Sequence, residues 1–213
     1  MQVTKDFYPL EDLLALKAFM RSGSPLVVGV DRASDIQTVL DLGADFDLPL
    51  ILIGVSEAWK VRDQLARQNV SVIIDPLNNL PGDFGRLGAR LDNAALVAAA
   101  GVRVALTVSD SQNARLLRQV AGNAVAHGMP WIQAFAAISS TPARIWGLEK
   151  SLGTLETGRA ANLVIWSGDP LEVTNWAEKV MANGQWVPMR SRQTRLYERY
   201  QSLDSANKPF GYR

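Results

Sequence analysis

Asp31, Asn78 and Asp110 each follow closely after an apolar segment of the sequence, and Asn113 comes three residues after the last of them. A carboxylate in such a position can bind a cation or accept a proton, and an amide can hydrogen-bond a polar substrate. Parallel strands place their carboxyl ends at one edge of a sheet, where α/β proteins bind their ligands. We therefore expect Asp31, Asn78 and Asn113 to contact a small-molecule substrate beside Asp110.

Each of these residues also has a purely structural interpretation. Asp110 directly precedes a predicted helix, where its carboxylate could cap the free backbone amides. Asp31 could be a solvated acid at the start of a helix, where the helix dipole favours it. Asn78 and its neighbour Asn79 lie in the segment 75–81, which proline bounds on both sides and which is typical of a turn. Both interpretations stay open at this point.

The sequence contains one histidine, His127, and no cysteine. His127 ends a predicted helix, where a partly charged ring interacts favourably with the helix dipole, and we favour this role over metal binding. A divalent ion that activates water needs three or more protein ligands, usually imidazoles. We therefore expect that this chain alone holds no metal ion.

Composition excludes several classes of protein. The 213 residues carry 22 Lys and Arg against 21 Asp and Glu, so the net charge of +1 predicts neither nucleic-acid nor anionic-membrane binding. No apolar run approaches the length of a membrane span. The first eight residues lack the apolar core of a signal peptide, so a cytoplasmic location is the default expectation.

Short apolar runs alternate with helical patterns through the first two thirds of the chain, which predicts an α/β fold with a parallel sheet. The predicted strands are 25–30, 48–54, 70–75 and 102–108, and the helices after them are 36–45, 58–68, 92–100 and 113–127. An opening helix over 10–20 should pack on this sheet.

The C-terminal third shows a different pattern. Helices are predicted over 131–138 and 142–147, then strands over 163–166, 179–182 and 185–188, and a polar helix over 191–200. Asn183-Gly184 is a strong signal for a two-residue hairpin turn. Leu196 and Tyr197 should face inward from the polar helix, and residues 208–211 should be irregular.

Three motifs of this region resemble the C-terminal end of the metal-dependent amidohydrolase superfamily, of the imidazolonepropionase and dihydroorotase type. They are Gly153-Thr-Leu-Glu-Thr-Gly-Arg-Ala-Ala-Asn-Leu-Val-Ile-Trp166, Gly168-Asp-Pro170 and Met181-Ala-Asn-Gly-Gln-Trp-Val187. The resemblance implies the C-terminal half of a (β/α)8 barrel, with four βα units, followed by short strands of a β-sandwich and a helix. The implied division is a partial barrel over 1–150, sandwich strands over 151–190, and a helix and tail over 191–213.

The resemblance also assigns roles at the site. Asp110 matches the family's eighth-strand aspartate, which binds the metal and takes the proton from the attacking water. The fifth and sixth strands of the family carry histidine ligands, whereas 28–32 and 53–55 contain none here. If a divalent, zinc-like ion binds at Asp110, its other ligands must come from a partner or from carboxylates.

The implied activity is hydrolysis of a carbon–nitrogen bond in a non-peptide or cyclic amide. A half-barrel exposes two strand edges and an apolar inner layer, so it needs either a separate N-terminal half or further copies of itself. The alternative is a half-barrel without catalysis, kept for assembly or for binding a small molecule. The sequence leaves both functions open.

Overall fold

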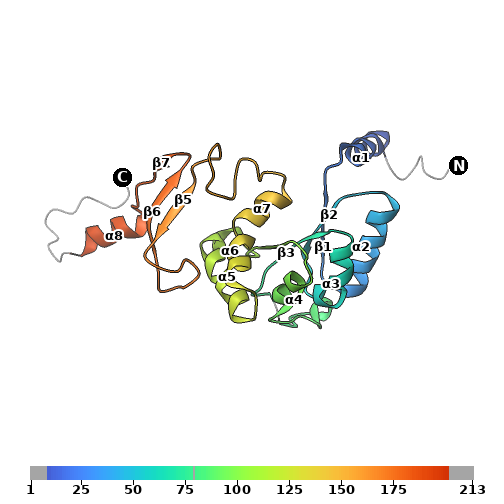
Figure 1. Cartoon of the computed structure of the whole chain (residues 1–213), viewed down its shortest axis with the longest axis horizontal. Coiled ribbons are helices and arrows are strands. Elements are labelled where there is room, and N and C mark those ends of the chain that lie inside the picture. The colour runs from blue at the N-terminus through green and yellow to red at the C-terminus, as the bar shows by residue number, and fades with distance from the viewer. Residues whose placement is uncertain (1–8, 79, 202–213) are drawn as a thin grey trace.

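The computed structural model describes residues 9–78 and 80–201, and it contains a four-stranded parallel sheet whose strands lie in chain order (Figure 1). The strands are β1 (Leu26–Val30), β2 (Leu50–Gly54), β3 (Ser71–Ile74) and β4 (Val104–Leu106). Leu26 is paired with Leu50, and Val72 with Val104. The predicted α/β fold with a parallel sheet is confirmed.

Helices follow the strands and cover one face of this sheet. They are α2 (Ala33–Asp45), α3 (Ala58–Arg67), α4 (Asn93–Ala99) and α5 (Leu117–Ala126), with 3-10 helices η1 (Phe84–Arg86) and η2 (Ser111–Leu116) in the loops. Leu40, Leu52, Leu65, Val72 and Val97 are fully buried between the two layers. The apolar stripe of each helix thus forms the core with alternate residues of the strands.

The other face of the sheet is only partly covered. Ile51 and Ala105 pack against Ile145 of α7 (Ser140–Ile145), which follows α6 (Trp131–Ala137). Val27 and Ile53, on the same face, are 39% and 36% exposed. Among the described residues β1 and β4 each pair on one side only, so the sheet is open and closure into a barrel stays a prediction.

A second, antiparallel sheet contains β5 (Leu163–Trp166), β6 (Ala177–Ala182) and β7 (Gln185–Trp186). Asn183 and Gly184 join β6 to β7 with φ of 49° and 79°, as a type I′ turn requires, so the predicted hairpin is confirmed. Helix α8 (Arg192–Tyr200) follows. Its Leu196 and Tyr197 are 41% and 70% exposed, so the prediction that they face inward is wrong.

The opening helix α1 (Leu10–Ser22) forms as predicted, but it does not pack on the sheet. Every residue of α1 keeps some exposure, and its apolar side chains Leu13, Leu14 and Leu16 are 41–56% exposed. No helix in 9–78 or 80–201 is long and apolar enough to cross a membrane. The irregular segment predicted at 208–211 lies outside the described residues.

Candidate functional site

The carboxyl ends of the four parallel strands gather the polar residues of the candidate site. Asp31 follows β1, Ser56 follows β2, Asp75 follows β3, and Ser109 and Asp110 follow β4. Because the strands are parallel and in chain order, these residues lie along one edge of the sheet.

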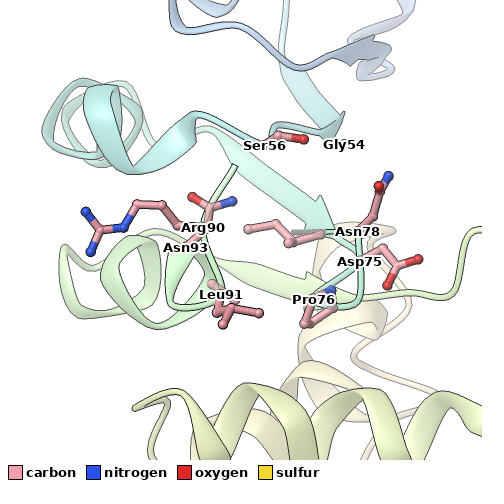
Figure 2. Close-up of a pocket in the computed structure, with 10 residues that line it drawn as sticks. Gly54, Ser56, Asp75, Pro76, Asn78, Arg90, Leu91 and Asn93 are labelled. Atoms are coloured by element: carbon pink, nitrogen blue, oxygen red, sulfur yellow. The ribbon is translucent and has the colours of Figure 1, made fainter. Parts of the chain in front are cut away.

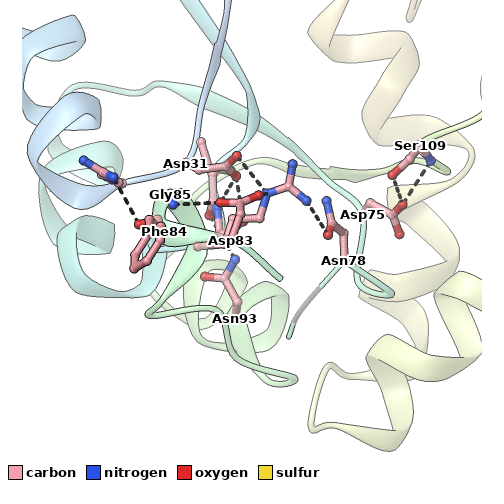
Figure 3. Close-up of polar contacts among 12 residues, drawn as sticks. Asp31, Asp75, Asn78, Asp83, Phe84, Gly85, Asn93 and Ser109 are labelled. Carbon is pink, nitrogen blue, oxygen red and sulfur yellow. Dashed lines mark hydrogen bonds and ion pairs between the residues drawn. The ribbon is translucent and has the colours of Figure 1, made fainter. Parts of the chain in front are cut away.

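Asp31 is held by a hydrogen-bond and ion-pair network. Its Oδ1 accepts from the backbone N (3.2 Å) and the hydroxyl (2.6 Å) of Ser56. Its Oδ2 lies 3.2 Å from Nε of Arg86, and Nη1 of the same guanidinium donates to Oδ1 of Asn78 at 2.6 Å (Figure 3). The structure therefore brings together two predicted site residues, Asp31 and Asn78, through an arginine that the sequence interpretation missed.

Arg86 belongs to the β3–α4 loop, whose described residues are 75–78 and 80–92 and which contacts residues that follow β1 and β2. Nη2 of Arg32 donates to the carbonyl of Phe84 at 3.1 Å, and the indole of Trp59 donates to the carbonyl of Gly88 at 2.8 Å. Together with Arg86 these contacts fix the loop against the sheet. Asn79, the alternative to Asn78, lies outside the described residues.

A buried amide supports the turn after β2. Asn93 is 5% exposed; its Nδ2 donates to the carbonyl of Val55, and its Oδ1 accepts from the backbone N of Trp59, both at 3.0 Å. Val55 has φ of 48°, an unusual backbone conformation for a β-branched residue. Asn93 thus stabilises a strained residue at the edge of the candidate site.

The carboxylate of Glu57 links the first turns of α2 and α3. Its Oε2 accepts from the backbone N of Ala33 at 3.0 Å, and its Oε1 lies 2.8 Å from Nζ of Lys60. Burial raises the pKa of this carboxyl, but the hydrogen bond from Ala33 and the ammonium of Lys60 outweigh burial and hold the pKa below its usual value. Glu57 is therefore a structural carboxylate that stays ionised.

Asp75 and Asp110 lie toward the β4 side of the site. Oδ2 of Asp75 accepts from the backbone N and the hydroxyl of Ser109. Oδ1 of Asp110 accepts from the backbone N of Gln112 at 3.1 Å, so Asp110 caps η2 as its structural interpretation predicts. Asn113 lies half-buried within η2. No hydrogen bond in the described part of the chain joins Asp110 or Asn113 to Asp31.

The donor groups present do not fit the metal centre that the family's pattern implies. No group of three or more His, Cys, Asp and Glu side chains in the described residues could hold an ion. His127 is the C-cap of α5, with Nδ1 2.8 Å from the carbonyl oxygen of Asn123. Gly54, which the resemblance matches to the family's sixth strand, has φ of 92°, and a Cβ there would lie 3.0 Å from Oδ1 of Asp31. A ligand side chain at position 54 would be strained and crowded.

Residues at the ends of β2 and β3, in the β3–α4 loop and at the start of α4 line a very small cavity. Gly54, Ser56, Asp75, Asn78 and Asn93 border a space of about 10 Å³ (Figure 2). This volume holds about one water molecule, so a substrate would have to bind on the open side of the strand ends.

Four consecutive parallel βα units with polar groups at the strand ends define an α/β protein of the kind that builds barrel enzymes. The model of the amidohydrolase family matches residues 16–187. The chain therefore belongs to the amidohydrolase family, within the metal-dependent superfamily that its C-terminal motifs indicate.

Individual relatives agree with this assignment. Imidazolonepropionase of Maricaulis maris (strain MCS10) is 31% identical over 112 residues, which cover 50% of this chain and 28% of the relative. An amidohydrolase from Thermotoga maritima MSB8 superposes with a TM-score of 0.79 and 24% identity, covering 89% of this chain and 50% of its own. Molinate hydrolase superposes with a TM-score of 0.60 and 16% identity, covering 84% of this chain and 45% of its own.

The solved structures are less than 25% identical to this chain in sequence, so the similarity to them shows the fold alone. The chain spans about half the length of these solved structures and 28% of the length of the imidazolonepropionase.

Proposed function

We propose that this chain forms one half of a (β/α)8 barrel that hydrolyses a carbon–nitrogen bond in a small molecule, a non-peptide or cyclic amide. One observation carries the proposal. The amidohydrolase family model matches residues 16–187, and Asp110, which the resemblance matches to the family's eighth-strand aspartate, follows the carboxyl end of β4. Barrel enzymes place their chemistry at this end of their strands.

Asp110 is the proposed general base. Its Oδ1 is held by Gln112, and its Oδ2 accepts no hydrogen bond from the described part of the chain, so Oδ2 is the atom to take a proton. As the water oxygen bonds to the amide carbon, its proton passes to Asp110. The same proton then passes to the departing nitrogen as the carbon–nitrogen bond breaks. Because the side chains of this chain's described residues do not by themselves fit a metal ion, the steps assigned to this chain use only its own residues.

The proposed substrate lies between two walls of the site. Asn113, in the same 3-10 helix that Asp110 caps, offers its amide to the substrate on one side. Asp31 and Asn78, which Arg86 holds in place, form the polar wall on the other side.

We further propose that a separate N-terminal half, with four more βα units, completes the barrel. The face of the parallel sheet that is opposite α2–α5 would face the inside of the barrel, and it is called the inner face. Support for the proposal comes from the unpaired edges of β1 and β4 within the described residues and from the exposure of Val27 and Ile53 on this inner face. An open concavity of about 500 Å³ also borders β1, with Gly29, Asp31 and Asp35 in its wall. A homo-oligomer that covers the same surfaces is the alternative to be tested.

A half-barrel without catalysis is the second candidate function, and a specific observation favours it. Arg86 holds Asp31, a side chain at position 54 would be strained and crowded, and neither 28–32 nor 53–55 carries the histidine that the resemblance implies there. Such a protein would serve assembly or bind a small molecule at the former active site.

The genomic neighbourhood separates the two functions at little cost. A neighbouring reading frame that encodes four βα units with a His-x-His pair would support hydrolysis. A neighbouring half without that pair would support the non-catalytic function.

Hydrolysis is tested with the assembled barrel and a panel of hydantoins, dihydropyrimidines and imidazolones. Asp110→Asn keeps the cap on Gln112 but removes the base, so activity should fall about 100-fold or more while the fold stays stable. Asp169→Asn is the matched control, since Asp169 likewise accepts from a backbone N two residues on, that of Leu171, outside the site. Equal activity of the Asp110→Asn variant and the unmodified protein would refute the proposed mechanism.

A further inference from the structure

The guanidinium of Arg86 occupies the point where the oxygens of the strand-end site converge. Nε lies 3.2 Å from Oδ2 of Asp31 and 3.5 Å from Oδ2 of Asp83, and Nη1 donates to Oδ1 of Asn78 at 2.6 Å. Figure 3 shows Asp31, Asp83 and Asn78 close to one another, with dashed lines for their hydrogen bonds and ion pairs. Carboxylate and amide oxygens are the ligands that a hard divalent cation would use.

This arrangement is fixed from several sides. The side chains of Arg86 and Asp31 are 31% and 27% exposed, so the pair is partly removed from solvent. Ser56 holds the second oxygen of Asp31, and Oδ1 of Asp83 accepts from the backbone N of Gly85 at 2.7 Å. The oxygens around the guanidinium therefore have little freedom to turn toward another cation.

We propose that Arg86 is the resident cation of this site and that it excludes a divalent metal ion from the strand ends. A guanidinium keeps its positive charge at every physiological pH. A divalent ion at the same oxygens would meet this charge at close range and would have to displace its hydrogen bonds. Arg86 is thus a positioning residue, because it holds the side-chain oxygens of Asp31 and Asn78 in place.

The role of Arg86 concerns the same site as the proposed function. It rests on that function only because the function locates the site at the carboxyl ends of the strands. Metal binding is measured without any hydrolysis, so failure of the hydrolase proposal and failure of this inference give different results.

The test is titration of the full chain with Mn²⁺, followed by water-proton relaxation, and with Zn²⁺, followed by equilibrium dialysis. The unmodified protein should bind neither ion at the strand ends. Arg86→Met keeps the apolar stem but removes the charge, so Asp31 and Asp83 should bind Mn²⁺ at least about 100-fold more tightly than the upper limit measured for the unmodified protein. Arg86→Lys keeps the charge and should still exclude the ion.

Arg103→Met is the matched control. Arg103 also bonds an asparagine side chain, with Nη2 2.9 Å from Oδ1 of Asn69, but at the opposite end of the sheet, so this variant should not gain affinity. Circular dichroism checks that each variant is folded.

Three results would overturn the inference. The first is one divalent ion per chain in the unmodified protein that Asp31→Asn removes, and this measurement does not depend on any Arg86 variant folding. The second is an Arg86→Met variant, folded, whose affinity equals that of the unmodified protein. The third is an Arg86→Lys variant that binds Mn²⁺ as tightly as Arg86→Met.

Discussion

Asp31 and Arg86 are 55 residues apart in the sequence, yet the carboxylate of one lies 3.2 Å from the guanidinium of the other. Asp31 directly follows β1, whereas Arg86 lies in the β3–α4 loop, so the contact spans the end of β2. Through this pair the β3–α4 loop covers the carboxyl end of β1.

The Asp31–Arg86 pair should stabilise the fold measurably. Asp31→Asn and Arg86→Met should each lower the free energy of unfolding, and a double-mutant cycle should give a coupling of about 1 kcal/mol, because the pair is partly buried and hydrogen-bonded. Urea denaturation of the four proteins measures it. A coupling indistinguishable from zero would show that the β3–α4 loop is held by its other contacts alone.

Replacing Asn93 should lower the free energy of unfolding more than replacing most other polar residues. Asn93→Ala leaves the carbonyl of Val55 and the backbone N of Trp59 without their partner in a buried region, so it should destabilise the protein by about 2–3 kcal/mol. Asn123→Ala, at a half-buried helix position, should cost far less. Equal losses in urea denaturation would contradict the role assigned to Asn93.

Much of the fold is predictable from the sequence because local patterns determine it. The period of the apolar residues identifies the strands and helices of the parallel sheet, and Asn183-Gly184 determines the hairpin. The position of α1 was not predictable, because an apolar stripe shows that a helix needs a partner but does not identify that partner. The same reason explains the exposed Leu196 and Tyr197 of α8.

The candidate site was predictable only in part. The positions of Asp31, Asn78 and Asp110 after strands, and the cap formed by Asp110, are local features that the sequence predicts, whereas their contact with a substrate stays a prediction. Arg86 was missed because it follows no strand and because its partner is distant in the sequence. The sequence gives one signal for it, the length of the loop after the third strand, since loops of this length in a compact domain are often functional.

Glu57 should make the stability of the protein depend on pH in the acidic range. Its pKa is lowered in the folded state, so its contribution is complete above the unfolded value of 4.5 and is lost as the pH falls through the folded value. In the Glu57→Gln variant, Tm should therefore fall less steeply than in the unmodified protein as the pH is lowered below about 4.5. Glu172→Gln, an exposed substitution, should not. Parallel Tm curves for the unmodified protein and Glu57→Gln would contradict the prediction.

The inner face of the sheet should matter for assembly and little for folding of the chain. Val27 is 39% exposed, so Val27→Lys should change the free energy of unfolding of the isolated chain by less than about 0.5 kcal/mol. In the assembly the lysine would be buried, so complex formation should be lost. Leu42→Lys is the control, since Leu42 is 44% exposed on α2. Assembly of the Val27→Lys variant with unchanged affinity would exclude this face from the interface.

The central claim is that four further βα units cover the inner face and the two open edges of the parallel sheet. The most direct test is the mass of the form in which this chain occurs in its own cells, measured by light scattering at natural abundance, with mass spectrometry of its components. The account predicts a mass above 23.3 kDa, from a second polypeptide or a longer chain that supplies four further βα units, whereas an assembly of copies of this chain alone would support the homo-oligomeric alternative. A monomer of 23.3 kDa would contradict it.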